Sequence, residues 1–142
     1  MSTSPLGTNK LTLLIDGEER AAEVSTAEIT NEETESDFVS FEMAAQGGGR
    51  DWKLHIVAVQ DPGDPNSLLN LTWDMAGTDV DVIVRPYGNA SASASAPHYT
   101  GTVTVKYPDG VLVGGEADAS GSARMTFEVE WDFIEKPTKV VA

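Results

Sequence analysis

The sequence predicts an all-β protein, a β-sandwich or small barrel of about eight mostly antiparallel strands with one short flanking α-helix. Two observations predict this class. Stretches rich in Val, Thr and aromatic residues recur along the chain, and clusters of Gly, Pro, Asn and Asp separate them about every ten residues. Within several stretches apolar and polar residues alternate, which is the period of a strand with one buried face.

The N-terminal third predicts three strands. Residues 10–15 and 20–29 flank Asp16-Gly17, a dipeptide that favours tight hairpin turns, so we expect these two strands to pair. Residues 38–45 alternate as well and predict a third strand, which the three glycines at 47–49 end.

The central part predicts two strands with a helix between them. Residues 51–59 and 78–85 alternate between apolar and polar side chains. Over residues 67–76 the apolar side chains follow helical spacing instead. Ser67 suits the N-cap of this helix and Gly77 suits its C-terminal stop, so we expect one short helix against the sheet.

The C-terminal third predicts a second hairpin and a closing strand. Residues 89–96 repeat Ser and Ala and predict a loop, whereas 100–107 and 111–116 predict a hairpin around Pro108-Asp109-Gly110. Residues 123–134 alternate most clearly and predict the last strand. The aromatic side chains expected in the core are Trp52, Phe127, Trp131 and Phe133.

Length predicts one domain over residues 1–142, with an N-terminal arm of about residues 1–9 and a C-terminal arm of about residues 135–142. The chain has no cysteine, which excludes disulfides and cysteine-based zinc sites. We expect neither a signal peptide nor a membrane span, because no stretch has the necessary run of apolar residues.

The charge is strongly negative. There are 23 acidic and 9 basic residues, and the formal net charge is -14. Such a surface is not expected to bind nucleic-acid phosphates tightly. Carboxylates that repel DNA would, however, let DNA move past the protein without binding to it.

The sequence offers little for catalysis or cofactors. Only His55 and His98 could act as imidazole bases, and neither lies near a nucleophile motif, so we expect both to be structural. Residues 61–64 lack the ligand spacing of a calcium loop. The glycines at 47–49 and 114–115 do not match a phosphate-binding loop. We therefore expect no enzyme activity, no metal and no cofactor.

Two acidic features leave alternatives open. The first is an acidic segment expected to be a loop, either solvated and mobile or ordered against a neighbouring subunit; it comprises Asn31, Glu32, Glu33, Thr34, Glu35, Ser36 and Asp37. The second is a stripe of Glu128, Glu130 and Asp132 on one face of the last strand. This stripe faces solvent or, if copies join their sheets around an axis, forms a ring of negative charge.

The order of several segments resembles that of a known family. In sequence order they are Asp51-Trp52-Lys53-Leu54, the helix ending Leu71-Thr72-Trp73-Asp74, a Val-rich strand, Pro86-Tyr87-Gly88, Tyr99-Thr100-Gly101-Thr102-Val103, Gly114-Gly115, and Trp131 followed by Pro137. Together they resemble the major tail proteins, or tail tube proteins, of long-tailed bacteriophages that infect actinobacteria. The resemblance spans about residues 11–137 and includes no diagnostic short motif.

The resemblance implies a subunit of the virion tail, assembled in the host cytoplasm, that forms hexameric rings by joining sheets. The rings would stack into a tube that conveys DNA without specific binding, and other tail proteins such as the tape measure and tail terminator would be partners. We expect Glu128, Glu130 and Asp132 to face the lumen, with Asp79 and Asp81 as second choices. Residues 31–37, the loop at 89–96 and both termini are candidates for contacts between rings.

Two other structural or binding roles remain open. One is a head decoration or capsid-cementing protein, which is also small, acidic and β-rich. The other is an extracellular carbohydrate-binding or adhesion module of the sandwich type, in which exposed tryptophans would stack on sugars.

Overall fold

The all-β class is confirmed. The computed structural model describes residues 6–33, 40–45 and 50–142, and these form eight strands in one antiparallel sheet. The strand order is β2-β1-β5-β6-β7-β4-β3, with β8 on β6; because β2 and β3 do not pair with each other, the sheet is not closed into a barrel. The strands are β1 (Thr12–Ile15), β2 (Glu18–Glu19), β3 (Val24–Glu33), β4 (Arg50–Val59), β5 (Asp79–Arg85), β6 (His98–Thr104), β7 (Thr126–Phe133) and β8 (Thr138–Val140).

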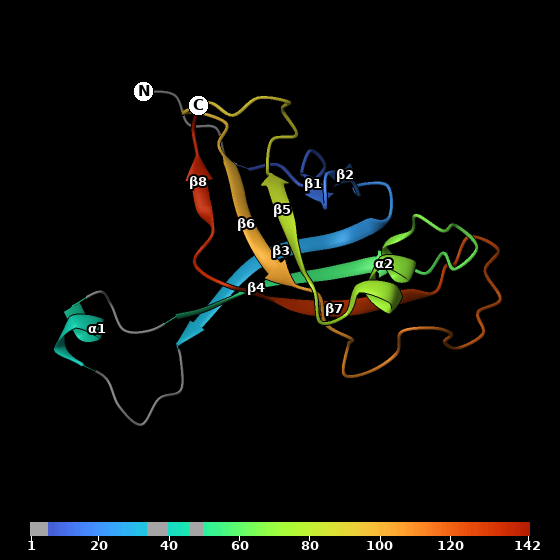
Figure 1. Ribbon diagram of the computed structural model, residues 1–142. Helices are drawn as coiled ribbons and strands as arrows, with labels where there is room; N and C mark the ends of the chain where they lie inside the picture. Colours follow the sequence, from blue (N-terminus) through green and yellow to red (C-terminus); the bar gives the residue numbers. More distant parts are fainter. Residues whose placement is uncertain (1–5, 34–39, 46–49) are drawn as a thin grey trace.

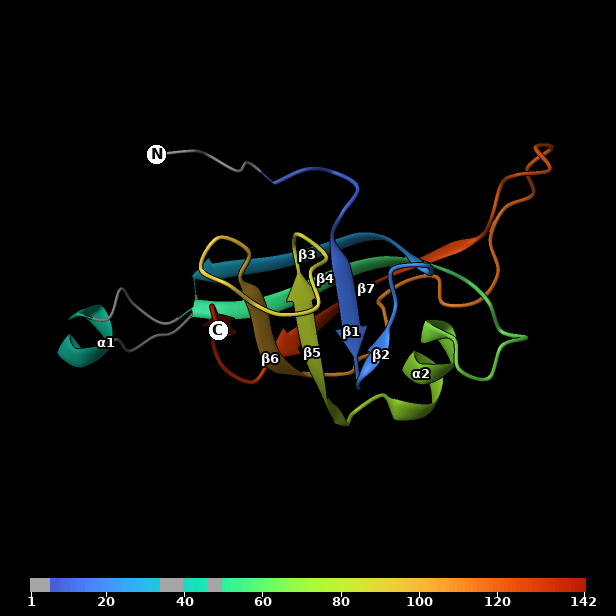
Figure 2. The same cartoon turned by 90° about the horizontal axis from the view of Figure 1, so that it is seen from above.

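The sheet folds over on itself into two layers. Strands β3, β4 and β7 form one layer, and they cross the layer of β1, β5 and β6 (Figures 1 and 2). The fold line lies between β6 and β7, which pair only through Val103↔Phe133 and Thr104↔Asp132. This arrangement corresponds to orthogonal sheet packing, in which a strand near the corner serves both layers.

The core fills the space between the layers. It is built mainly by the alternate inward residues of β1, β4, β5, β6 and β7, which period-2 alternation predicts, and helix α2 adds Leu68 and Leu69. The buried apolar side chains are Leu13, Ile15, Leu54, Ile56, Ala58, Leu68, Leu69, Val80, Val82, Val84, Val103, Val105, Phe127, Val129, Trp131 and Phe133.

The first hairpin differs from the prediction. Asp16-Gly17 does form its turn, and both residues have positive φ, 53° and 82°. The partner of β1 is the two-residue β2, however, and not the stretch 20–29. The chain turns again at Arg20 and then crosses to the other layer, where β3 pairs with β4 over nine register positions from Val24↔Ala58 to Glu33↔Arg50.

Two predicted strands are wrong. Residues Phe41–Ala45, within the expected strand 38–45, form the short helix α1, and Phe41 is 96% exposed. None of the described strands pairs with this stretch, and its Glu, Met and Ala residues favour a helix. The expected strand 111–116 is loop, because the side chain of Gln60 bonds to the backbone of Gly114 at 2.8 and 2.7 Å in place of a partner strand.

Helix α2 (Leu68–Met75) is confirmed, including its ends. The Ser67 hydroxyl accepts a hydrogen bond from the amide of Asn70 at 3.3 Å, and Gly77 has a φ of 90° just after the helix. Leu68 and Leu69 are buried, so the helix anchors to the core beside β4. Residues 89–96 form a loop with one bridge between Ser93 and Ala96, as the sequence predicts a loop there.

The region expected as a C-terminal arm contains strand β8. It pairs with the first half of β6 through His98↔Val140, Tyr99↔Lys139 and Thr100↔Thr138. One edge of β6 therefore pairs with β8 along its first residues and with β7 along its last residues.

Candidate functional site

Charged residues gather on the outward side of the layer formed by β3, β4 and β7. The register places His55 opposite Glu28 on β3 and opposite Glu130 on β7, and Lys53 opposite Asp132. Because directly paired residues share a face of the sheet, all of these side chains point away from the core. We call this surface the charged face: Glu28, Glu32, Lys53, His55, Glu128, Glu130 and Asp132.

Lys53 lies at the centre of the charged face. Its Nζ lies 2.6 Å from a carboxylate oxygen of Glu32 and 3.2 Å from one of Glu130. These hydrogen bonds to Glu32 and then Glu130 raise the pKa of Lys53 above its usual range, so the amine stays charged. The lysine thereby connects the outer strands of its layer, β3 and β7, across β4.

His55 repeats the arrangement two residues further on. Its Nδ1 lies 2.9 Å from Glu28 and its Nε2 lies 2.9 Å from Glu128. The hydrogen bonds to Glu28 and then Glu128 raise the pKa of His55 above its ordinary value of 6.5. His55 is thus an ion-paired residue on the outward face.

The remaining predicted acidic residues extend this face across the fold of the sheet between β7 and β6. Asp132 is 3.1 Å from the amine of Lys106. Beyond the β6–β7 junction, the hydroxyls of Thr104 and Thr102 donate to the carboxylates of Asp79 and Asp81 at 2.7 and 2.8 Å. The five acidic residues singled out from the sequence therefore lie on one continuous outward side of the folded sheet.

The acidic stripe is ion-paired, and the sequence analysis did not predict which residues pair with it. The charges alternate in two rows across the three strands. One row is Glu32, Lys53 and Glu130, and the other is Glu28, His55 and Glu128. The alternation in β4 already placed Lys53 and His55 on the polar side. Their partners depend on strand order, which the sequence does not give.

The acidic segment 31–37 is only partly within the described residues. Asn31, Glu32 and Glu33 are not loop but the end of strand β3, where they pair with Trp52, Asp51 and Arg50. Thr34, Glu35, Ser36 and Asp37 lie outside the described residues.

Strand β3 is a long edge of the sheet. It runs for ten residues and pairs with β4 alone, so along its other side the described chain offers its backbone groups no strand. Such an edge is a ready template for pairing with another chain, and proteins usually cover or shorten it.

Three of the four predicted core aromatic residues are buried. Trp131 is fully buried, and its indole N–H donates to the carbonyl of Lys106 at 3.1 Å; Phe127 and Phe133 are buried beside it. Trp52 is only partly buried and packs against the rim of the core, because it lies near the open end of β4.

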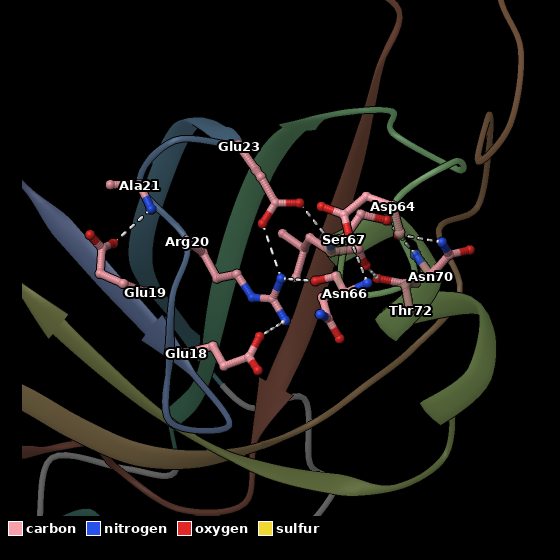
Figure 3. A network of polar contacts seen from close by, with 11 residues as sticks. Glu18, Glu19, Arg20, Ala21, Glu23, Asp64, Asn66, Ser67, Asn70 and Thr72 are labelled. Atoms are coloured by element: carbon pink, nitrogen blue, oxygen red, sulfur yellow. Dashed lines mark hydrogen bonds and ion pairs between the residues drawn. The ribbon is translucent and has the colours of Figure 1, made fainter.

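A buried arginine that the sequence did not single out joins the sheet to α2. Arg20 is 6% exposed, and its guanidinium lies 3.2 Å from Glu18 and 3.0 Å from Glu23 and donates to the carbonyl of Asn66 (Figure 3). The carboxylate of Glu23 also accepts from the amide of Leu68, at 2.9 Å. Arg20 is therefore a buried cation that bonds to two glutamates and to the backbone just before helix α2. These contacts indicate a structural role.

Neither the histidines nor the carboxylates of the described residues assemble a metal site. His98 is buried, and its Nε2 bonds to the carbonyl of Asn89 at 2.9 Å. Within the described ranges no helix is long and apolar enough to cross a membrane.

No protein-family profile matches the chain. No curated protein matches it in sequence either.

Proposed function

We propose that the chain is a structural subunit that assembles with copies of itself into hexameric rings, which stack into a phage tail tube. DNA passes through this tube without specific binding, and the tape measure and tail terminator proteins are further partners in the virion tail. The long open edge of β3 is the observation that carries the proposal.

An open edge favours assembly because ring closure removes it. A subunit that adds a strand to its neighbour, and accepts one in turn, leaves no edge exposed once the rotation closes. In this chain the edge at the other end of the sheet is short, since β2 has two residues and β1 four. The ten residues of β3 therefore form the main surface for strand addition.

The outward face supports the lumen assignment through its charge. The residues described above contribute seven carboxylates, counting Asp79 and Asp81, against Lys53, Lys106 and His55; Asp51 and Arg85, one of each charge, share the same face by strand alternation. The net charge is negative whether or not His55 is protonated, so this face repels a polyanion. We assign Glu128, Glu130 and Asp132 to the lumen wall.

Electron microscopy of the purified protein at rising concentration tests the assembly. Rings or hollow tubes with a central channel are the expected result. A protein that stays monomeric at the highest concentration reached contradicts the proposal.

Thiol labelling of assembled tubes tests the lumen assignment, because the chain has no native cysteine. In Glu128→Cys, a small maleimide should react, whereas a bulky polymer maleimide should not enter the tube. The matched control is Asp74→Cys on the exposed side of helix α2, which should react with both reagents. Equal reaction of Glu128→Cys with both reagents would place this face on the outer wall.

A second function, carbohydrate binding, is favoured by one observation. Trp73 and Tyr107 are each 57% exposed, and the Tyr107 hydroxyl donates to the carbonyl of Trp73 at 3.0 Å. Neighbouring exposed aromatic rings suit stacking on sugars. Glycan binding by the wild type that Trp73→Ala abolishes, in a protein that forms no rings, would favour this function.

A further inference from the structure

An apolar cavity opens between the two layers at one end of the molecule. Its volume is about 840 Å³, and its walls include Leu11, Ile29, Trp52, Val84 and Tyr99. Trp52, Ile29 and Tyr99 are only partly buried, so the cavity leaves apolar surface of the core accessible. It borders the open edge strand through Ala27, Glu28 and Ile29 of β3.

Two lysines lie on the rim of this cavity, and Glu28, which also lines it, bonds to His55. The lysines are Lys136 and Lys139, and both are exposed. Neither forms an ion pair with a described residue, and Lys136 lies 5.9 Å from the centre of the Trp52 ring. In a chain with 23 acidic residues and 9 basic ones, two lysines that pair with no described carboxylate beside an apolar cavity indicate an acidic, apolar occupant.

A segment of that chemistry projects from the opposite end of the molecule. Residues 105–125 join the end of β6 to the start of β7, whereas the cavity lies at the start of β6 and just past the end of β7. Figures 1 and 2 show this β6–β7 loop extending away from β8. Its Val111 and Val113 are 56% and 57% exposed, and Glu116 and Asp118 follow.

The loop holds its valines in place. Leu112, between them, packs against the core, so Val111 and Val113 face away from it. The next residue, Gly114, is fixed by Gln60, whose side chain also bonds to the carbonyl of Thr126 at 2.8 Å. Two apolar side chains are thus presented on a segment that is tied at its base, which lowers the entropy lost on docking.

We propose that the cavity receives the β6–β7 loop of a second copy of this chain, with Val111 and Val113 on its apolar walls and Glu116 and Asp118 near Lys136 and Lys139. The inference rests on the proposed self-assembly and names one of its contacts. Donor and acceptor surfaces lie at opposite ends of the molecule, so the contact is head-to-tail. A head-to-tail contact repeats along an axis, as stacking of rings requires.

Disulfide trapping tests the contact without depending on rings. Two single-cysteine variants, Val113→Cys on the loop and Thr138→Cys on the cavity wall, are mixed and oxidised mildly. The control mixture replaces Thr138→Cys by Ala22→Cys, an exposed position on the β2–β3 turn outside the cavity lining. Circular dichroism checks that each variant is folded.

The 113–138 pair should cross-link about tenfold more than the control pair, because docking raises the local thiol concentration. Adding Lys136→Glu and Lys139→Glu to the Thr138→Cys variant should lower the yield by about tenfold, since like charges then meet at the rim. Glu116→Lys and Asp118→Lys on the loop variant should restore it. Equal yields for the two pairs, or no effect of charge reversal, overturn the inference.

The outcome separates this inference from the proposed function. Selective cross-linking without rings or tubes in the microscope upholds the head-to-tail contact and overturns the tube. Tubes that form normally with Val111→Asp and Val113→Asp together uphold the tube and overturn the contact. In a third outcome the chain stays monomeric, the two cysteine pairs cross-link equally, and the cavity binds a small amphipathic acid. That outcome overturns both the head-to-tail contact and the tube.

Discussion

His55 bonds diagonally to Glu128, with 2.9 Å between Nε2 and the carboxylate, although the register places Glu130 opposite His55. Lys53 shows the same offset: it bonds to Glu130 and lies opposite Asp132. The right-handed twist of the sheet shifts facing side chains along the strands, so diagonal neighbours come within reach of long side chains.

The imidazole of His55 makes the stability of this face dependent on pH. Its pKa is higher in the folded state than its ordinary value of 6.5, because Glu28 and Glu128 accept from its two nitrogens. Its contribution is therefore complete below pH 6.5 and is lost as the pH rises through the raised pKa. His55→Gln should cost about 0.5 kcal/mol per ion pair below that range and little above it. Urea unfolding of both proteins across pH measures the difference; a difference that grows with pH would contradict the assignment.

Arg20 should be important for stability. Arg20→Met removes the charge between Glu18 and Glu23 and the bond to the carbonyl of Asn66, and should lower the free energy of unfolding by about 3 kcal/mol. Glu18→Gln is the control, because Glu18 is exposed and its loss should cost about 1 kcal/mol or less. Equal effects of the two variants in urea unfolding would show that burial does not matter here.

Trp131 should be far more sensitive than Trp73. Trp131→Phe leaves the carbonyl of Lys106 without its indole donor and opens space in the core, so it should cost about 2 kcal/mol. Trp73→Phe changes an exposed ring and should alter stability by about 0.5 kcal/mol at most. Thermal unfolding followed by circular dichroism compares them. A similar loss in both would contradict the burial of Trp131.

Gly88 should tolerate no side chain. It has a φ of 71°, and a Cβ there would lie 2.5 Å from the carbonyl oxygen of Lys10. Gly88→Ala should therefore destabilise the fold by about 2 kcal/mol or more. Gly110→Ala is the matched control, because its Cβ meets nothing within 4 Å. Chemical unfolding should separate the two variants clearly, and a neutral Gly88→Ala would rule out the close approach.

Local pattern was a good guide where a segment has one buried and one exposed face. Strands β4, β5 and β7 follow alternation, and α2 follows helical spacing together with Ser67 and Gly77. The same rule failed at Phe41–Ala45 and at 111–116, because alternation predicts a strand only if another layer or strand is present to cover it.

The sequence by itself determined the all-β class, most of the core and the positions of the acidic side chains on the outward face, because these follow from the two-residue period of a strand. Only the tertiary structure decided strand order, and with it the partners of each charge. Lys53 and His55 meet acids from β3 and β7, which are separated from β4 along the chain. Such contacts depend on which strands become neighbours when the sheet folds over, a long-range choice that no local pattern encodes.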